Sequence, residues 1–152
     1  MGLILALARA RQRIRELEDA LVQESIPEPA KLIGLNVASS ILLDKMEEMG
    51  CPGAEIYLPD TLMRVYTKES VIKFLELEET DKIVYQAENK DCDDFAAILY
   101  GEFLGLVWTN LHALNFFISN ENELYFVEPQ TDQISQTLAG WQGDSFRFFL
   151  GR

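Results

Sequence analysis

The sequence contains a cysteine, a histidine and a glutamate whose order and spacing favour thiol chemistry. Cys92 lies in the segment Asp91-Cys92-Asp93-Asp94-Phe95-Ala96, the single histidine is His112, and Glu128 follows it. An imidazole can take the proton of a thiol, and a carboxylate can fix the tautomer of that imidazole and stabilise its charged form. The three residues therefore predict a catalytic group of nucleophile, base and orienting acid.

The element that must position Cys92 is a helix. Apolar residues recur at helical spacing behind Asp91, a residue type suited to the N-cap, so Cys92 is expected to be the first helical residue. Free N–H groups and the positive end of the helix dipole favour a thiolate there. Neighbouring aspartates oppose it by like-charge repulsion, so we expect His112 to provide most of the activation.

A β-hairpin must position the other two residues. Strand formers flank a polar turn, over the ranges 111–118, 119–123 and 124–128. One register pairs Ile118 with Leu124. It places Glu128 on the same sheet face as His112, within reach of the imidazole, and a register that pairs these two directly serves equally well. A slip by one residue moves Glu128 to the opposite face, so its role depends on register.

The N-terminal segment predicts a helical arm. Residues 3–24 are strong helix formers with an apolar stripe at spacings of four and three, formed by Leu3, Leu7, Ala10, Ile14, Leu17 and Leu21. The stripe can pack on the protein's own core or on a second copy, giving a homo-oligomer through residues 3–24, and both interpretations stay open. Pro27 and Pro29 end the arm. We expect a helix over residues 1–25 and one domain over residues 30–152.

The remaining elements predict an α+β class. Helix patterns cover residues 30–49, with a bend near Gly34, and a segment that begins with Ser70 as its cap. A short strand is predicted at residues 54–58, and residues 81–85 are predicted to form a strand or a turn into one. We expect an antiparallel sheet covered on one side by helices, with the Cys92 helix packed on it.

Composition limits the class of protein. A chain of 152 residues with 48% apolar residues can bury one core, and a net charge of −12 argues against nucleic acid as a partner. The two cysteines have neither metal-ligand spacing nor the density of a disulfide framework. The apolar run at the N-terminus is too short for a signal peptide or a bilayer span, which predicts a cytoplasmic protein without a membrane partner.

The order of these residues resembles a known family. A helix-borne cysteine followed by a histidine and an acid on adjacent strands is similar to the papain-like and transglutaminase-like cysteine hydrolase core. The more specific resemblance is to the C-terminal cysteine-protease domain of the Marasmius oreades agglutinin and its bacterial relatives. It spans about residues 54–135 and depends on Tyr57-Leu58-Pro59-Asp60, Asp91-Cys92-Asp93-Asp94-Phe95-Ala96, His112-Ala113-Leu114-Asn115 and Glu128-Pro129-Gln130.

The resemblance implies a papain-like fold and a calcium-stimulated peptidase that acts on a peptide or protein substrate. The leading expectation is a cysteine hydrolase, a peptidase or amidase, with an acyl-enzyme on Cys92, and an acyl transferase would use the same residues. The alternative is a non-catalytic papain-fold module that assembles or docks through the N-terminal helix. The lectin half of the agglutinin is absent, so the resemblance does not imply sugar binding.

Two further sets of residues are candidates around Cys92. The backbone N–H of Cys92 and the side chain of Asn89 are candidates for an oxyanion hole. Calcium is the implied cofactor, and Asp91, Asp93 and Asp94 are its candidate ligands, although these aspartates can equally cap the helix and solvate the loop. Trp108 and Trp141 either wall a cleft or belong to the core.

Overall fold

The computed structural model describes residues 2–138, 140, 141, 143 and 145–152. Its helices are α1 (Gly2–Ser25), α2 (Leu35–Glu48), α3 (Lys68–Leu75), the short 3-10 helix η1 (Thr80–Lys82) and α4 (Cys92–Glu102). Its strands are β1 (Lys31–Gly34), β2 (Glu55–Tyr57), β3 (Leu62–Val65), β4 (Gly105–Thr109), β5 (Ala113–Ile118), β6 (Leu124–Glu128), β7 (Gln133–Ser135) and β8 (Phe146–Leu150). The mixture of helices with a largely antiparallel sheet confirms the predicted α+β class.

The main sheet has the strand order β2-β8-β4-β5-β6-β7. Its neighbours pair antiparallel except for β2 and β8, which are parallel. The strands β1 and β3 form a separate antiparallel pair. In the β5–β6 hairpin Ile118 pairs with Leu124, which confirms the first of the two predicted registers.

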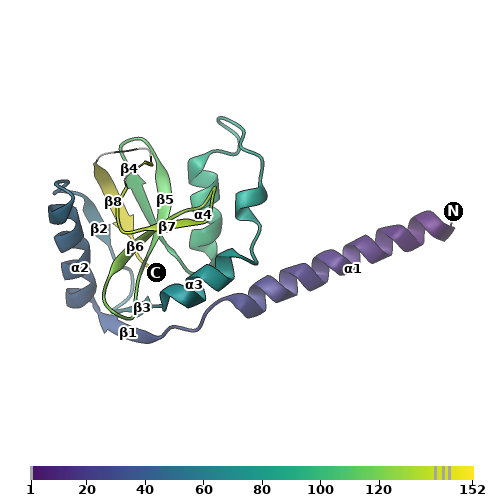
Figure 1. Cartoon of the computed structure of the whole chain (residues 1–152), viewed down its shortest axis with the longest axis horizontal. Helices are drawn as coiled ribbons and strands as arrows, with labels where there is room; N and C mark the ends of the chain where they lie inside the picture. Colours follow the sequence, from purple (N-terminus) through teal and green to yellow (C-terminus); the bar gives the residue numbers. More distant parts are fainter. Residues whose placement is uncertain (1, 139, 142, 144) are drawn as a thin grey trace.

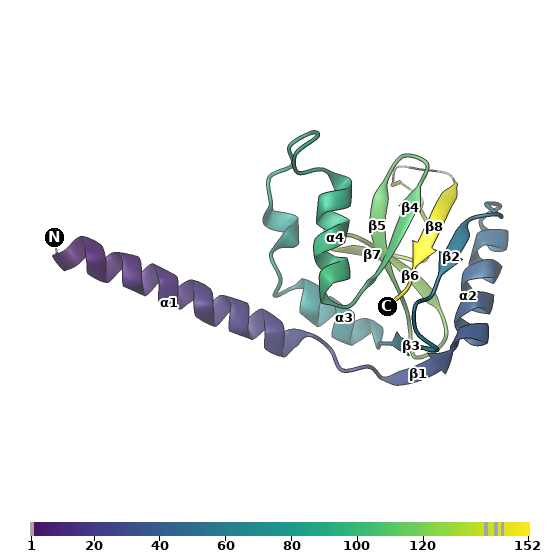
Figure 2. The same cartoon turned by 180° about the vertical axis from the view of Figure 1, so that it is seen from behind.

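Both faces of the sheet are covered by helices, so the prediction of one covered face is wrong. The helix α2 lies on one side and α3 with α4 on the other (Figures 1 and 2). Alternate residues of β5 enter the two cores, Phe116 packing in the same cluster as Leu42 of α2 and Phe117 in the cluster of Leu99 of α4. Every residue of β5 is buried, as expected for a strand with apolar layers on both faces.

The N-terminal arm is a helix that extends away from the rest of the molecule (Figures 1 and 2). Its apolar stripe stays exposed at Leu7, Ile14, Leu17 and Leu21, and the Leu3 side chain lies outside the described residues. Its C-terminal end is anchored, since Val22 packs against the cluster that contains Phe74 and the Gln23 side chain donates to Glu102 at 3.4 Å. None of the described helices is long and apolar enough to cross a membrane.

Two local predictions are wrong, each because another contact decides the structure. Residues 31–34 form β1 rather than helix, since they pair with β3 and the Ala30 N–H donates to the Val65 carbonyl at 2.8 Å. The cap of α3 is Thr67, whose hydroxyl accepts from the Ser70 N–H at 3.1 Å. For residues 81–85, where a strand or a turn into one was expected, the structure has no strand: the start belongs to η1, and an isolated bridge joins Gln86 to Lys90 just after the segment.

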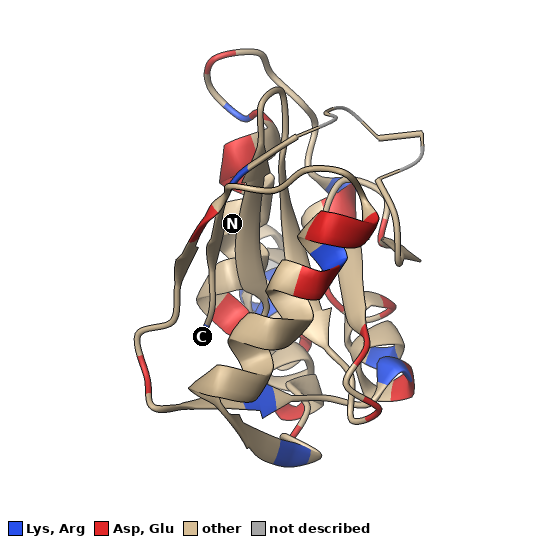
Figure 3. Ribbon diagram, turned by 90° about the vertical axis from the view of Figure 1, so that its left-hand side faces the viewer, with Lys and Arg blue, Asp and Glu red and all other residues tan. Residues whose placement is uncertain are grey.

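The charged residues are spread over many elements. Asp and Glu positions outnumber Lys and Arg positions and occur on helices and loops alike in the view of Figure 3, in keeping with the net charge of −12. A distribution of this kind maintains solubility.

Candidate functional site

The centre of the candidate site is the pair formed by His112 and Glu128. His112 directly precedes β5 and Glu128 ends β6, so the observed hairpin register brings them together. The imidazole Nε2 and the carboxylate Oε2 are 2.6 Å apart, and the two side chains are 7% and 10% exposed. A hydrogen bond of this length fixes the tautomer and orientation of the ring, because the nitrogen facing the carboxylate must carry the proton.

A threonine holds the turn that presents His112. The hydroxyl of Thr109 accepts hydrogen bonds from the N–H groups of Leu111 at 3.2 Å and His112 at 2.9 Å. The Thr109 N–H donates to the His112 carbonyl at 2.8 Å. Thr109 was not among the residues predicted from the sequence, although a threonine that begins a tight turn is a recognisable signal.

Neighbouring backbone N–H groups hold the Glu128 side of the pair in place. The second carboxylate oxygen of Glu128, Oε1, accepts from the Gln130 N–H at 3.2 Å, and the Thr131 N–H donates to the Glu128 carbonyl at 3.2 Å. Both oxygens of the carboxylate therefore have a donor, and its orientation is set by the chain immediately after β6.

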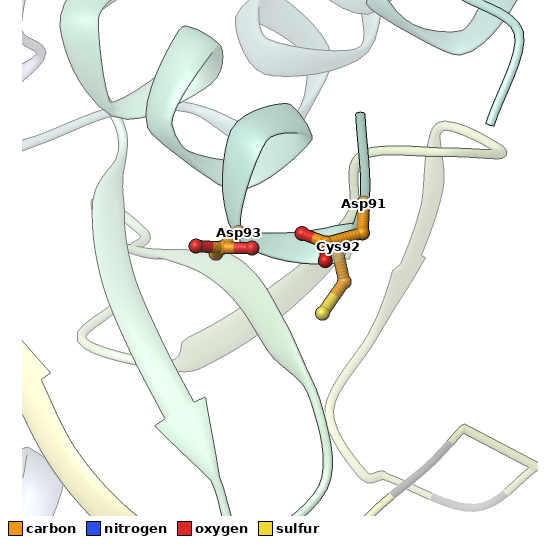
Figure 4. Close-up of side chains that lie close together, drawn as sticks. All are labelled: Asp91, Cys92 and Asp93. Carbon is orange, nitrogen blue, oxygen red and sulfur yellow. The ribbon is translucent and has the colours of Figure 1, made fainter. Parts of the chain in front are cut away.

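Cys92 is the first residue of α4, as predicted, and its thiol is free and half-buried. Its sulfur points away from the helix and from the Asp93 carboxylate (Figure 4). Cys92 and His112 line the same pocket of about 360 Å³, together with Trp108, Arg147 and their neighbours. The structure thus brings the predicted thiol and imidazole to one cavity.

A second pocket of about 300 Å³ lies on the carboxylate side of the pair. His112 and Glu128 line it with Gln130, Thr131, Gln133, Gly140 and Trp141. The Trp141 indole N–H donates to the Gln133 side chain at 3.3 Å. His112 is the residue common to both pockets.

The two tryptophans wall these pockets, one in each. Trp108 is half-buried and stacks on Phe148, with ring centroids 5.4 Å apart. Its indole Nε1 is buried and has no hydrogen-bond partner among the described residues. Trp141 packs at the edge of the core on the α2 side. Each tryptophan therefore lines one of the two pockets, and Trp141 also packs against the core.

The predicted ligands around Cys92 have other contacts. Asp91 and Asp94 form a capping box at the start of α4, in which the Asp91 N–H donates to the Asp94 carboxylate at 3.3 Å. Asp93 is exposed, and hydrogen bonding to Asp91 followed by burial raises the pKa of its carboxyl. The side chain of Asn89 donates to Gln86 at 2.8 Å, and Asn89 is not among the residues that line the Cys92 pocket.

The residue that joins α4 to the sheet was also not predicted from the sequence. Asn115 is fully buried, and its amide donates to the carbonyls of Ala96 at 2.9 Å and Gly105 at 3.1 Å. These bonds fix the helix that bears Cys92 against the strands that bear His112. A buried asparagine within a strand of apolar residues is the signal that indicates such a role.

No family model and no curated protein matches the chain. Solved structures match its fold. One, described as "PSL1a-E64 complex", is 22% identical with a TM-score of 0.63 and covers 78% of this chain and 50% of that chain. Another, "Polyporus squamosus lectin bound to human-type influenza-binding epitope Neu5Aca2-6Galb1-4GlcNAc", is 22% identical with a TM-score of 0.56 and covers 73% of this chain and 48% of that chain. The chain therefore spans about half the length of these solved chains.

These matches overturn the predicted family. They are structures of Polyporus squamosus lectin, and one is described with a bound glycan, so the papain-like and transglutaminase-like assignment is wrong. The predicted cysteine hydrolase, peptidase or amidase, with its peptide or protein substrate, is corrected for the same reason. The physical reason is general: a cysteine, a histidine and an acid in one order define neither a fold nor a ligand.

Proposed function

We propose that the chain binds an acidic oligosaccharide across the two pockets that flank His112. The observation that carries this proposal is that the pockets share His112 and that each contains a tryptophan beside hydrogen-bonding side chains. The glycan described for Polyporus squamosus lectin supports it.

The pocket beside Glu128 suits a neutral sugar ring. The side chains of Gln130 and Gln133 both donate and accept hydrogen bonds, as sugar hydroxyls do, and the Glu128 carboxylate accepts them. Trp141 supplies a flat apolar surface on which the C–H face of a sugar ring can pack. A concave site with an aromatic wall and a few polar groups is the usual form of a small-ligand pocket.

The pocket beside Cys92 suits an acidic sugar. Arg147 is an exposed cation on a chain whose net charge is −12, so it offers an anion a local attraction that most of the surface does not. Trp108 lines the same pocket, so its ring offers an apolar surface beside the cation. We expect the carboxylate of a sialic acid in this pocket and the uncharged sugars in the other.

The test is calorimetric titration of the full chain with two sugars. Neu5Aca2-6Galb1-4GlcNAc is compared with Galb1-4GlcNAc, which lacks the acidic residue. We expect the affinity for the acidic trisaccharide to be at least about tenfold higher than for the neutral disaccharide. A tenfold ratio corresponds to about 1.4 kcal/mol of binding free energy. Failure of both sugars to bind at millimolar concentration would contradict the proposal.

Two variants and a control locate the site. Arg147→Gln should remove the preference for the acidic sugar and leave the neutral sugar unaffected, whereas Trp141→Ala should weaken both. Arg64→Gln is the matched control, because Arg64 is also an exposed arginine but lies outside both pockets. An equal effect of the two arginine variants would place binding elsewhere.

A separate proposal concerns the thiol. We propose that Cys92 is a reactive thiol whose proton His112 can accept, with Glu128 orienting the imidazole and no substrate reaction assigned to it. The hydrogen bond between His112 and Glu128 and the pocket common to Cys92 and His112 support it. The rates at which iodoacetamide alkylates Cys92 and Cys51 test it, and equal, slow rates would contradict it.

A further inference from the structure

A group of carboxylates lies apart from Cys92. Glu78 follows the C-terminal end of α3, Asp81 belongs to η1, and Asp132 lies in the turn between β6 and β7, with a left-handed φ of 57°. One oxygen from each of the three carboxylates lies within 4.8 Å of the others. Two segments that are distant in the sequence thus direct carboxylates at one point.

Each of these carboxylates has a buried oxygen without a donor outside the group. The atoms are Glu78 Oε1, Asp81 Oδ1 and Asp132 Oδ1: no other group of the described residues donates to them, and the carboxyls of Glu78 and Asp132 lie within hydrogen-bonding reach of each other. Glu78 is 5% exposed, and its other oxygen accepts from the Thr80 N–H at 2.7 Å, which orients the side chain. A buried carboxylate oxygen without a donor is costly unless a cation compensates it.

The electrostatics of the group agree with that geometry. Burial raises the pKa of the Glu78 carboxyl, and burial together with the charges of Glu78 and Asp81 raises the pKa of Asp132 to about 7. The nearby ammonium of Lys82 lowers the pKa of Asp132, but it pairs with Glu79, Nζ to Oε1, at 3.1 Å. Negative charge is therefore concentrated here without a matching cation from the described side chains.

We propose that Glu78, Asp81 and Asp132 bind a calcium ion. All three donors are oxygens, the ligand type that Ca²⁺ takes at 2.3–2.6 Å, with backbone carbonyls and waters completing six to eight ligands. Three carboxylates favour Ca²⁺ over Mg²⁺, which is usually held by one or two carboxylates and retains several waters. The other close group, Asp91 with Cys92 and Asp93, includes a sulfur, a soft ligand that suits Ca²⁺ poorly.

A calcium ion at this point would tie η1 to the turn after β6. That turn also contains Gln130 and Thr131, which line the pocket beside Glu128. The inference goes beyond the proposed sugar binding and does not depend on it, since calcium binding is measured without any glycan.

The experiment is a calorimetric titration of the chelator-treated full chain with CaCl₂ at pH 7.5, with Tm measured with and without the ion. We expect one binding event and a higher Tm with Ca²⁺, because a ligand that binds only the folded state stabilises it. Asp132→Asn and Glu78→Gln should each weaken binding about tenfold or more. If Asp132→Asn does not fold, Asp81→Asn, which alters a side chain that is only half-buried, gives the same test.

Two controls distinguish this site from its neighbours. Glu79→Gln removes an adjacent exposed carboxylate, and Asp93→Asn removes one from the group at Cys92, so both should bind Ca²⁺ as the unmodified chain does. The absence of heat and of a Tm shift would mean that the carboxylates share a proton only, which overturns the inference. Binding that survives Asp132→Asn but is lost in Asp93→Asn would overturn it as well.

Discussion

His112 and Glu128 meet at 2.6 Å between Nε2 and Oε2, across a hairpin whose register places them on one face. Both side chains are almost fully removed from solvent. The pair is therefore part of the structure as well as part of the candidate site, and its removal should affect stability and chemistry separately.

Truncation of the acid should destabilise the fold. Glu128→Ala removes the partner of a buried imidazole, and we expect it to lower the free energy of unfolding by about 2 kcal/mol, with Glu128→Gln costing less because an amide can still accept a hydrogen bond. Urea denaturation measures both values. Glu121→Ala, at an exposed turn position, is the matched control, and an equal cost for the two alanine variants would show that the pair does not stabilise the protein.

The two cysteines should differ in reactivity. Iodoacetamide at pH 7 should modify Cys92 at least about tenfold faster than Cys51 under the proposal that His112, in the same pocket, accepts the Cys92 proton. The Cys51 thiol instead donates to the Met49 carbonyl at 3.3 Å. Peptide mass spectrometry gives the two rates. His112→Gln should abolish the difference, and equal, slow labelling of both thiols would refute the role of His112.

The same labelling reports on sugar binding. A glycan that occupies the pocket of Cys92 and His112 covers the thiol, so the acidic trisaccharide should slow alkylation of Cys92 and leave Cys51 unaffected. Arg147→Gln should reduce that protection. If calorimetry detects the sugar but Cys92 is unprotected, the sugar binds outside this pocket.

The buried asparagine should be needed for the contact between α4 and the sheet. Asn115→Ala leaves the carbonyls of Ala96 and Gly105 without its amide, and we expect it to cost about 2 kcal/mol of unfolding free energy. Urea denaturation again measures the effect. Asn120→Ala, whose residue is exposed, should change the stability by less than about 0.5 kcal/mol.

The arm should promote self-association. The stripe of Leu7, Ile14, Leu17 and Leu21 is exposed, and a single helix of this length is marginal without a partner surface. We therefore expect sedimentation velocity to show association that increases with protein concentration. Ile14→Glu should weaken it, whereas Gln12→Glu, the same charge change on the opposite face, should not. A chain that stays monomeric at all concentrations would exclude this role.

Local signals in the sequence predicted the elements that position the site. Asp91 before a helical run identified the start of α4, and two runs of strand formers around a polar turn identified the hairpin, whose observed register is one of the two that the sequence left open. These predictions succeed because capping and side-chain alternation are short-range effects. The prediction for residues 31–34 was wrong because their structure is decided by a long-range contact, the pairing with a strand about 30 residues further along the chain.

Local sequence signals could not predict which ligand the pockets bind. The sequence places Cys92, His112 and Glu128 in order, but the surfaces around them come from residues such as Arg147 and Trp141, whose approach depends on tertiary structure. The carboxylates of Glu78 and Asp132 are more than 50 residues apart, so their proximity is equally a tertiary property. Ligand identity depends on the cavity rather than on the triad order.

The hairpin that joins His112 to Glu128 also has a consequence for the order of folding. Only 16 residues separate the two side chains, so closing this loop costs little chain entropy, and hairpins form on a timescale of about 1–10 μs. Arg147 reaches the site only after β8 has paired with β4, a contact between distant parts of the chain. We expect the His112–Glu128 pair to form early in folding and Arg147 to reach the pocket later. The site would then form in two kinetic stages.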